Sequence, residues 1–147
     1  YLQLLPDAFL FYRCDRYDVL GKRYLTVNSK YYPVDQGLRL ALLGNKRPNM
    51  SSRLEGIVYL ELRRRGYRVY VGTVPQGEVD FVAERGGVIE YYQVSASVEN
   101  EDTYAREVSS FKAIRDNYRK VLLTRDAGTY NDNGIEQINV EEWLLSQ

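Results

Sequence analysis

The sequence predicts a mixed α/β (α+β) domain whose core follows the order helix, three meandering strands, crossover helix, strand (αβββαβ). Residues 77–83 and 90–95 alternate between two faces and are rich in β-branched and aromatic side chains, as strands are. Gly86-Gly87 between them predicts a two-residue hairpin turn, because glycine adopts the positive φ that such turns require. Apolar residues recur with helical spacing before and after this pair of strands. Residues 1–48 are expected to add a β-hairpin and a short helix as an N-terminal appendage.

Composition limits the classes of protein to which the chain can belong. Its 147 residues suffice for one compact domain, or one domain and a small appendage, and 44% of them are hydrophobic. Twenty basic and twenty acidic side chains cancel, so any nucleic-acid-binding surface must be local. No long apolar run and no signal peptide occur, and Cys14 is the single cysteine. These features predict a cytoplasmic protein without a membrane segment or an internal disulfide.

The residue inventory also limits the chemistry. There is no histidine, which excludes serine–histidine triads, cysteine–histidine dyads and histidine-ligated zinc. A reaction would have to use carboxylates, lysine or arginine, hydroxyls, or a hard metal ion held by oxygen ligands. The chain opens at Tyr1 and its only methionine is Met50, so we expect it to be a piece of a longer protein.

Two strand-like stretches, residues 9–12 and 24–27, predict the N-terminal hairpin. Because a lone hairpin is marginally stable in water, we expect it to lean on the core or on a missing partner. It is either the wing of a winged-helix segment, with Lys22, Arg23 and Lys30 as phosphate contacts, or a plain interdomain hairpin.

A short helix is predicted at residues 36–43, with Asp35 as its N-cap. The turn-forming residues 44–49 then mark the boundary with the core. The predicted division is therefore a winged-helix-like segment over 1–48 and a core domain over 49–147.

The first core helix is predicted at residues 52–65. Ser52 is its expected N-cap, Glu55 completes a capping box, and Gly66 ends the helix at the C′ position. Glu61 falls within the apolar stripe and is expected to pair with an arginine. The stripe consists of Leu54, Ile57, Val58 and Leu62.

The remaining core elements follow from the same patterns. A second helix over residues 103–117 turns Val108, Phe111 and Ile114 inward. The apolar run 120–124 predicts a buried strand, parallel to the second hairpin strand through a crossover. The other expected elements are a strand at 67–71, a loop at 126–133, a strand at 135–140 and a helical turn at 141–145.

Asp80 is the first candidate for a functional residue. An acidic side chain in the middle of a core strand is costly to bury unless it has a partner or a metal. Gln93 lies on the antiparallel neighbour, and we expect it to be within reach of Asp80. A carboxylate and an amide on adjacent strands are oxygen donors of the kind that hard metal ions accept.

The αβββαβ order is that of restriction-endonuclease-like folds, and it invites comparison with the PD-(D/E)xK nuclease pattern. Such a site has an acid on the middle strand, an acid and a lysine on the next strand, and often a glutamate from the first helix. The carboxylates hold Mg²⁺ or Mn²⁺, which activates water, and the lysine stabilises the charge that develops on the phosphate.

Only part of this pattern is present. Asp80 matches the strand acid and Glu55 the helix acid, whereas Gln93-Val94-Ser95 stands where the second acid and the lysine belong. Gln93 offers an uncharged amide oxygen, and Ser95 offers no cation. We therefore predict a degenerate, weak or inactive site made by Asp80, Glu55, Gln93 and Ser95, in which the first three would be the ligands of Mg²⁺ or Mn²⁺.

The second core helix carries further candidates. Arg106 or Lys112 would replace the missing cation, and both, with Lys22 and Arg23, are candidate nucleic-acid contacts. Arg106-Glu107 either completes a site beside Gln93 or forms a structural ion pair.

Several stretches in combination resemble a known family. They are KYYPVDQGLR (30–39), EGIVYLELRRRG (55–66), GEVDFV (77–82), YQVS (92–95) and TYARE (103–107). On these residues the chain is similar to the uncharacterised domain found C-terminal to the ATPase module of prokaryotic AAA-type ATPases. The resemblance implies an upstream ATPase domain in the same polypeptide as a partner. No P-loop motif occurs in this chain, so ATP binding and ATPase activity would lie upstream.

The sequence leaves three functions open. The first is a DNA-associated, nuclease-like domain with a weak or inactive site. The second is an interaction or oligomerisation module that regulates the ATPase without touching nucleic acid. The third is an active Mg²⁺- or Mn²⁺-dependent DNA endonuclease. DNA binding that weakens steeply with salt would favour the first over the second, and metal-dependent cleavage that is lost in Asp80→Ala would favour the third.

Overall fold

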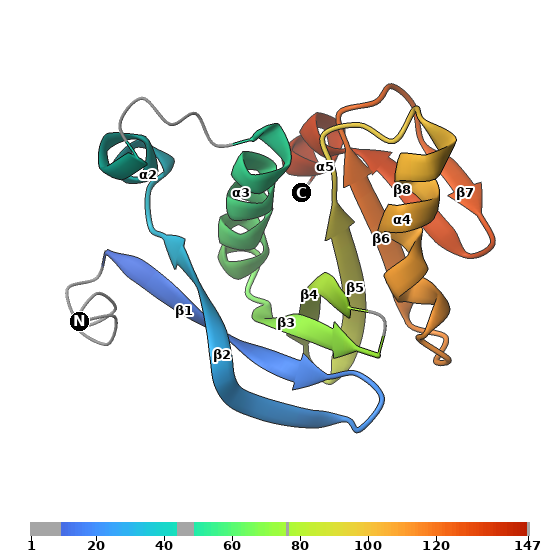
Figure 1. Cartoon of the computed structure of the whole chain (residues 1–147), viewed down its shortest axis with the longest axis horizontal. Helices are drawn as coiled ribbons and strands as arrows, with labels where there is room; N and C mark the ends of the chain where they lie inside the picture. The colour runs from blue at the N-terminus through green and yellow to red at the C-terminus, as the bar shows by residue number, and fades with distance from the viewer. Residues whose placement is uncertain (1–9, 44–48, 76, 147) are drawn as a thin grey trace.

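The computed structural model describes residues 10–43, 49–75 and 77–146, and it has a mixed α/β fold (Figure 1). The described residues form one eight-stranded sheet and four helices. The strands are β1 Phe11–Asp18, β2 Arg23–Pro33, β3 Arg68–Val74, β4 Gly77–Arg85, β5 Val88–Val94, β6 Arg119–Thr124, β7 Tyr130–Asp132 and β8 Ile135–Asn139. The helices are α2 Gln36–Leu43, α3 Met50–Arg64, α4 Glu101–Lys112 and α5 Val140–Leu145.

The central part of the chain follows the predicted order of elements. Helix α3 leads into the antiparallel meander β3–β4–β5, and α4 crosses over to β6, which pairs with β5 in parallel. Strand β8 then adds to β6 in parallel, and the strand order across the sheet is β2-β1-β3-β4-β5-β6-β8-β7. The predicted helix, meander, crossover helix and strand are thus confirmed.

The N-terminal hairpin is an integral part of this sheet. Strand β1 pairs antiparallel with β2 and parallel with β3, where Arg16 lies opposite Val71 and Asp18 opposite Thr73. Both strands are longer than expected, and β2 continues to Pro33. The hairpin therefore leans on the core directly. The expected boundary at residues 44–48 lies outside the described residues.

Two apolar clusters hold the helices on opposite faces of the sheet. On one face, α3 and α5 pack against the sheet in a cluster that includes Val58, Leu62, Phe81 and Trp143. On the other face, α4 packs through Val108 and Phe111, as the sequence predicts. Ile114 is buried with them, which confirms its predicted inward position. The sheet is thus covered on both sides, and a site at the ends of its strands can receive side chains from both layers.

The observed capping of α3 corrects one prediction. The N-cap is Asn49, whose Oδ1 accepts a hydrogen bond of 2.7 Å from the backbone N–H of Ser52. The expected capping box of Ser52 and Glu55 was wrong, because Asn49 takes the N-cap position three residues earlier. The carboxylate of Glu55 is therefore available for other partners. The helix ends before Gly66, whose φ of +84° confirms the predicted C′ glycine.

Other local predictions are met to different degrees. Asp35 caps α2 by accepting hydrogen bonds from the N–H groups of Gly37 and Leu38. Glu61 pairs with Arg64 and Arg65, as expected, and its side chain is only 11% exposed.

The second core helix differs from the prediction. It is shifted towards the N-terminus, because the side chain of Asn100 caps it, and it ends at Lys112 rather than at residue 117. The expected loop at 126–133 contains the short strand β7.

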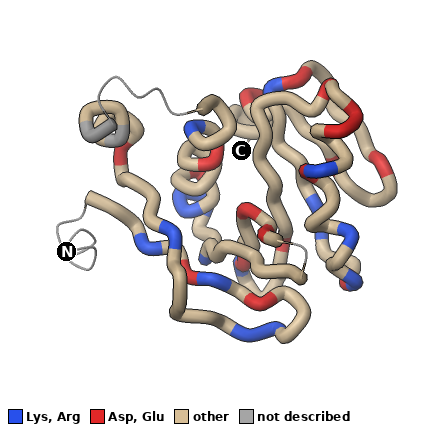
Figure 2. Tube along the Cα trace, in the orientation of Figure 1, with Lys and Arg blue, Asp and Glu red and all other residues tan. Residues whose placement is uncertain are grey.

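Charged residues of both signs are distributed along the trace (Figure 2), in keeping with the balanced composition. Within the described ranges, no helix has the length and apolar character that a membrane span needs.

Candidate functional site

Asp80 lies at an irregularity of the sheet. In the β3–β4 pair, Tyr70 lies opposite Val82 and Gly72 opposite Val79, so that Asp80 and the residue after it share one position of β3. An extra residue of this kind is a β-bulge, which bends the strand and re-aims its side chains. The bulge thus gives the side chain of Asp80 a different direction from that of a side chain at a regular strand position.

The predicted proximity of Asp80 and Gln93 is confirmed. The backbone N–H of Asp80 donates to Gln93 Oε1 at 3.2 Å, and Asp80 Oδ2 accepts from the backbone N–H of Val94 at 2.9 Å. The Gln93 side chain of β5 is thus bound to the backbone of β4, and the Asp80 side chain of β4 is bound to the backbone of β5. The Asp80 carboxylate is therefore held in place at the end of β5.

Gln93 connects this pair to helix α4. Its Nε2 donates to Glu107 Oε2 at 3.2 Å, and Glu107 Oε1 accepts from Arg106 at 3.1 Å. The side chain of Arg106 is 73% exposed. Arg106-Glu107 thus forms the ion pair that was one of the two alternatives, and Glu107 also binds the side chain of Gln93.

The N-terminal hairpin contributes to the site from the other side. Glu55 Oε1 accepts from the Tyr32 hydroxyl at 2.5 Å and from Lys30 Nζ at 3.4 Å. Lys30 Nζ also lies 3.1 Å from Glu78 Oε2, and Glu78 Oε1 accepts from Arg16 Nη1 at 2.5 Å. Strands β1 and β2, helix α3 and strand β4 therefore meet in one network of charged side chains.

Four residues of this network were missed or given another role by sequence reasoning. The sequence predicts Lys30 only as a phosphate contact on a wing and predicts that Glu78 faces solvent, whereas Tyr32 and Arg16 are not singled out by it. The signal for Lys30 and Tyr32 is their spacing, because residues two apart on a strand point to the same face. That signal becomes useful only when β2 is known to continue to Pro33.

The network changes the ionisation of Asp80. Burial and the carboxylates of Glu55 and Glu107 raise the pKa of Asp80 to about 7, against the opposing effects of the Val94 N–H and the Lys30 ammonium. The Asp80 carboxyl is therefore partly protonated at neutral pH. A partly buried acid that titrates near pH 7 among other charged groups is a candidate for a functional residue.

The same network disfavours the charged form of Asp80 and favours the charged form of Lys30. Burial alone would lower the pKa of Lys30, but the carboxylates of Glu55, Asp80 and Glu78 outweigh it and raise the pKa above its ordinary value. The ammonium group therefore stays charged across the physiological range of pH. It forms ion pairs with an acidic side chain from each of two elements, Glu55 of α3 and Glu78 of β4.

The capacity of the site to hold a metal depends on very few donors. Among the described residues, no group of three or more His, Cys, Asp or Glu side chains is arranged to bind a metal ion. Of the three predicted ligands, Gln93 offers only an uncharged amide oxygen that also accepts from Asp80, so the charged donors are the carboxylates of Asp80 and Glu55. Mg²⁺ is commonly bound by one or two carboxylates together with substrate phosphates and water. The two carboxylates would thus need a phosphate group to complete the coordination.

Ser95 has a structural environment. Its side chain is buried, its Oγ donates to the carbonyl of Ser97 at 3.2 Å, and its backbone N–H donates to Leu123. The described contacts of Ser95 thus lie with the loop after β5 and with β6. The structure does not bring Ser95 into the hydrogen-bonded network of Asp80, Gln93 and Glu55.

The remaining candidate cations lie on exposed surfaces. Lys22 and Arg23 are at the tip of the β1–β2 hairpin, where Arg23 Nε lies 3.0 Å from Asp18 Oδ2. Lys112 is exposed at the end of α4 and lines a separate cavity. Of the four predicted nucleic-acid contacts, only Arg106 is joined to the Asp80 network through described hydrogen bonds.

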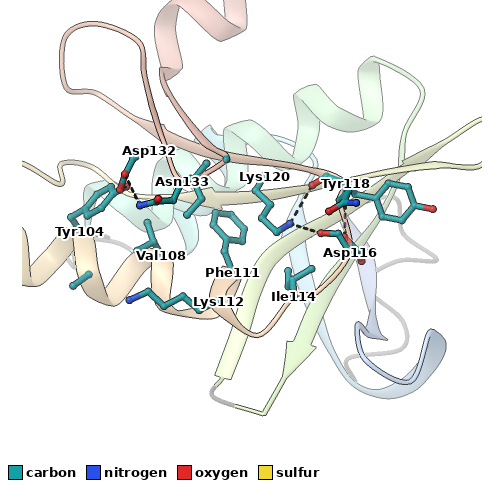
Figure 3. A pocket seen from close by; sticks show the side chains of 14 residues that line it. Tyr104, Val108, Phe111, Lys112, Ile114, Asp116, Tyr118, Lys120, Asp132 and Asn133 are labelled. Atoms are coloured by element: carbon teal, nitrogen blue, oxygen red, sulfur yellow. Dashed lines mark hydrogen bonds between the residues drawn. The ribbon is translucent and has the colours of Figure 1, made fainter.

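The separate cavity lies between α4, β6 and the β7–β8 turn (Figure 3) and has a volume of about 560 Å³. Val108, Phe111 and Ile114 form an apolar lining. Two of the polar side chains at the cavity are engaged with each other, since the Tyr104 hydroxyl donates to Asp132 Oδ2 at 2.8 Å. This cavity shares no lining residue with the Asp80 network.

Two uncharacterised proteins match the chain over nearly its whole length. One, from Haemophilus influenzae, is 46% identical over 149 residues, which cover 99% of this chain and 36% of that protein. The other, from Methanocaldococcus jannaschii, is 32% identical over 148 residues, which cover 97% of this chain and 32% of that protein. The chain thus spans about a third of the length of the curated relatives that it matches. No family model matches the chain, and no solved structure matches it significantly.

These comparisons correct the expected partner. The resemblance implied an ATPase domain upstream in the same polypeptide, but both matched proteins are uncharacterised and neither is described as an ATPase. A fused ATPase domain is therefore not indicated, and we withdraw it as a partner.

Proposed function

We propose that this chain is a DNA-associated domain with a restriction-endonuclease-like core, whose nuclease site is degenerate and cleaves weakly or not at all. The observation that carries the proposal is the pairing of Asp80 with Gln93 on adjacent strands, within electrostatic range of the carboxylate of Glu55 from α3. In the PD-(D/E)xK pattern the acids lie on the first helix, the middle strand and the following strand, where this chain has Glu55, Asp80 and Gln93.

The order of the elements supports the same proposal. Helix α3, the meander β3–β4–β5, helix α4 and strand β6 follow one another as in the αβββαβ core. The bulge at Asp80 adds to this support, because bulges are common beside active sites, where they re-aim a side chain.

The degenerate character of the site follows from what each residue can do. Gln93 has no charge, its amide oxygen is occupied by Asp80, and Ser95 is buried with its hydroxyl engaged elsewhere. Asp80 and Glu55 remain to hold Mg²⁺ or Mn²⁺ together with a phosphate, and such an ion would activate water and neutralise charge on the phosphate. With two carboxylates in place of three, we expect the metal to bind weakly.

Contact with DNA is proposed for the rim of the site. Arg106 is the most exposed cation of the network and is tied to Gln93 through Glu107. A guanidinium in this position would bind a phosphate oxygen next to the two carboxylates. Because the net charge of the chain is zero, the attraction must come from such local groups, and it should be screened strongly by salt.

The test is cleavage of plasmid, single-stranded and branched DNA in the presence of Mn²⁺, together with DNA affinity measured against salt concentration. Asp80→Asn is compared with the wild type, and Asp102→Asn, an exposed carboxylate at the start of α4, is the matched control. We expect DNA binding at low salt that weakens as salt rises, and little or no cleavage. Rapid cleavage that is lost only in Asp80→Asn would show an active nuclease instead. The absence of DNA binding at low salt would refute the proposal.

A further inference from the structure

We propose that Lys30 is the phosphate-binding cation of this site and fulfils the role of the lysine that the chain lacks at position 95. This inference rests on the proposed function, since it names the group through which the nuclease-like site would hold a phosphate. It differs from the sequence pattern, because the cation comes from β2 in the N-terminal hairpin rather than from the strand that carries Gln93.

The first argument is the hydrogen-bonding capacity of the ammonium group. A lysine ammonium has three N–H donors. In the described structure Lys30 Nζ has two acceptors, Glu55 Oε1 at 3.4 Å and Glu78 Oε2 at 3.1 Å. The side chain is 31% exposed, so the group is accessible from solvent. One donor is thus available for a phosphate oxygen that approaches Glu55 and Asp80.

The second argument is the way in which the fold fixes Lys30. Tyr32, two residues further along β2, is only 6% exposed and its ring stacks on Tyr59 of α3 at 4.2 Å between centroids. The Tyr32 hydroxyl donates to Glu55, the same carboxylate that Lys30 contacts. This stacking and this hydrogen bond anchor the end of β2 on α3. They thereby keep Lys30 within contact of Glu55.

Glu78 provides a second anchor for Lys30. Glu78 bridges Lys30 and Arg16, so its carboxylate is held between β2 and β1. A flexible lysine loses side-chain entropy when it is ordered for binding. Here two carboxylates have already ordered the ammonium, and less ordering remains to be done when a phosphate binds.

The third argument is charge. Glu55, Asp80 and Glu107 would repel a phosphate, and Lys30 is the cation that interacts with two of them. A cation that is already placed among acidic groups lets a phosphate diester approach them. Lys30 would act through its charge and a hydrogen bond and would transfer no group itself.

The test compares Lys30→Met and Lys30→Arg with the wild type. Arg115→Met, which removes one exposed charge after the end of α4, is the matched control. DNA affinity is measured against salt concentration, and cleavage is measured with Mn²⁺. In Lys30→Met we expect the affinity at low salt to fall about 10-fold and the slope of log affinity against log salt to decrease by about 1, because one phosphate contact is lost. Lys30→Arg should recover most of the affinity, and Arg115→Met should retain that of the wild type.

Any detectable cleavage provides a second readout. We expect Lys30→Met to lower the cleavage rate by about 100-fold, the typical effect of removing one group that stabilises charge on the reacting atoms. If Lys30→Met does not fold, as judged by circular dichroism, Lys30→Gln replaces it, because the amide can still donate to Glu55 and Glu78.

The outcomes separate this inference from the proposed function. If the wild type binds DNA and the neutral Lys30 variant binds with the same affinity and salt slope, Lys30 is not the phosphate-binding cation and the proposed function stands. If Lys30→Arg is as impaired as Lys30→Met, the side chain has a structural role and the inference is overturned. If the wild type neither binds nor cleaves DNA, both the proposed function and the inference are refuted.

Discussion

Replacing Asp80 by Asn should stabilise the protein at alkaline pH. Burial and the neighbouring carboxylates raise the pKa of Asp80 to about 7, whereas an unfolded aspartate titrates near pH ~3.9. The folded state therefore binds the proton more tightly than the unfolded state does. Below pH ~4 the carboxyl is protonated in both states and its ionisation does not affect stability. As the pH rises from about 4 to about 7, the wild type loses stability, and the loss is complete above that range.

The magnitude follows from the difference in pKa. A difference of about 3 pH units at about 1.4 kcal/mol each sets an upper limit of about 4 kcal/mol. Asp80 is partly exposed, so solvent and structural relaxation reduce this figure, and we expect Asp80→Asn to raise the free energy of unfolding by about 1 to 3 kcal/mol at pH 8. Asparagine keeps an oxygen that can accept the hydrogen bond from Val94.

The assay is urea-induced unfolding, followed by circular dichroism at pH 4, 6 and 8. The difference between Asp80→Asn and the wild type should grow with pH, because only the wild type has to ionise a carboxyl at this position. Asp102→Asn, at an exposed position, should show no such growth. A difference that is the same at pH 4 and pH 8, or a variant that is less stable than the wild type at pH 8, would contradict the argument.

Two further predictions concern groups that fix the site. Tyr32→Phe removes the hydrogen bond to Glu55 but keeps the ring that stacks on Tyr59, so we expect the free energy of unfolding to fall by about 1 to 2 kcal/mol in urea titrations. An unchanged stability would mean that the hydrogen bond contributes nothing. Asn49→Ala removes the N-cap of α3 and should lower the free energy of unfolding by about 1 kcal/mol, whereas Asn49→Asp, which can still accept the bond from Ser52, should stay close to the wild type. Equal losses in the two variants would show that capping is not the cause.

The proximity of Asp80 and Gln93 could be predicted because a two-residue turn determines the register of a hairpin. Gly86-Gly87 makes Arg85 pair with Val88, and each further step along the strands brings the next two residues opposite each other. Counting back from the turn brings Asp80 opposite Gln93. A local pattern was sufficient here, since both strands and their turn lie within eighteen consecutive residues of the chain.

The position of Lys30 could not be predicted in the same way. It depends on the parallel pairing of β1 with β3, which joins Arg16 to Val71, and no local turn encodes such a long-range pair. The bulge at Asp80 is also invisible in the sequence, because a run of alternating residues gives no sign that one position is duplicated. The cap of α3 was missed for another reason. Asn49 and Ser52 are both good N-cap residues, and propensity alone does not choose between them.

The pairing of β1 with β3 has a consequence for how the molecule folds. In this pair Arg16 meets Val71 across a long stretch of intervening chain, whereas the β3–β4–β5 meander forms through short turns. Contacts between residues far apart in sequence require a large loss of chain entropy and tend to form slowly. Until the hairpin docks, β3 is an open sheet edge with unpaired backbone groups, which invites association with other chains. Lys30 and Tyr32 arrive with that same hairpin, so the charged network around Asp80 should be completed only when this edge is closed.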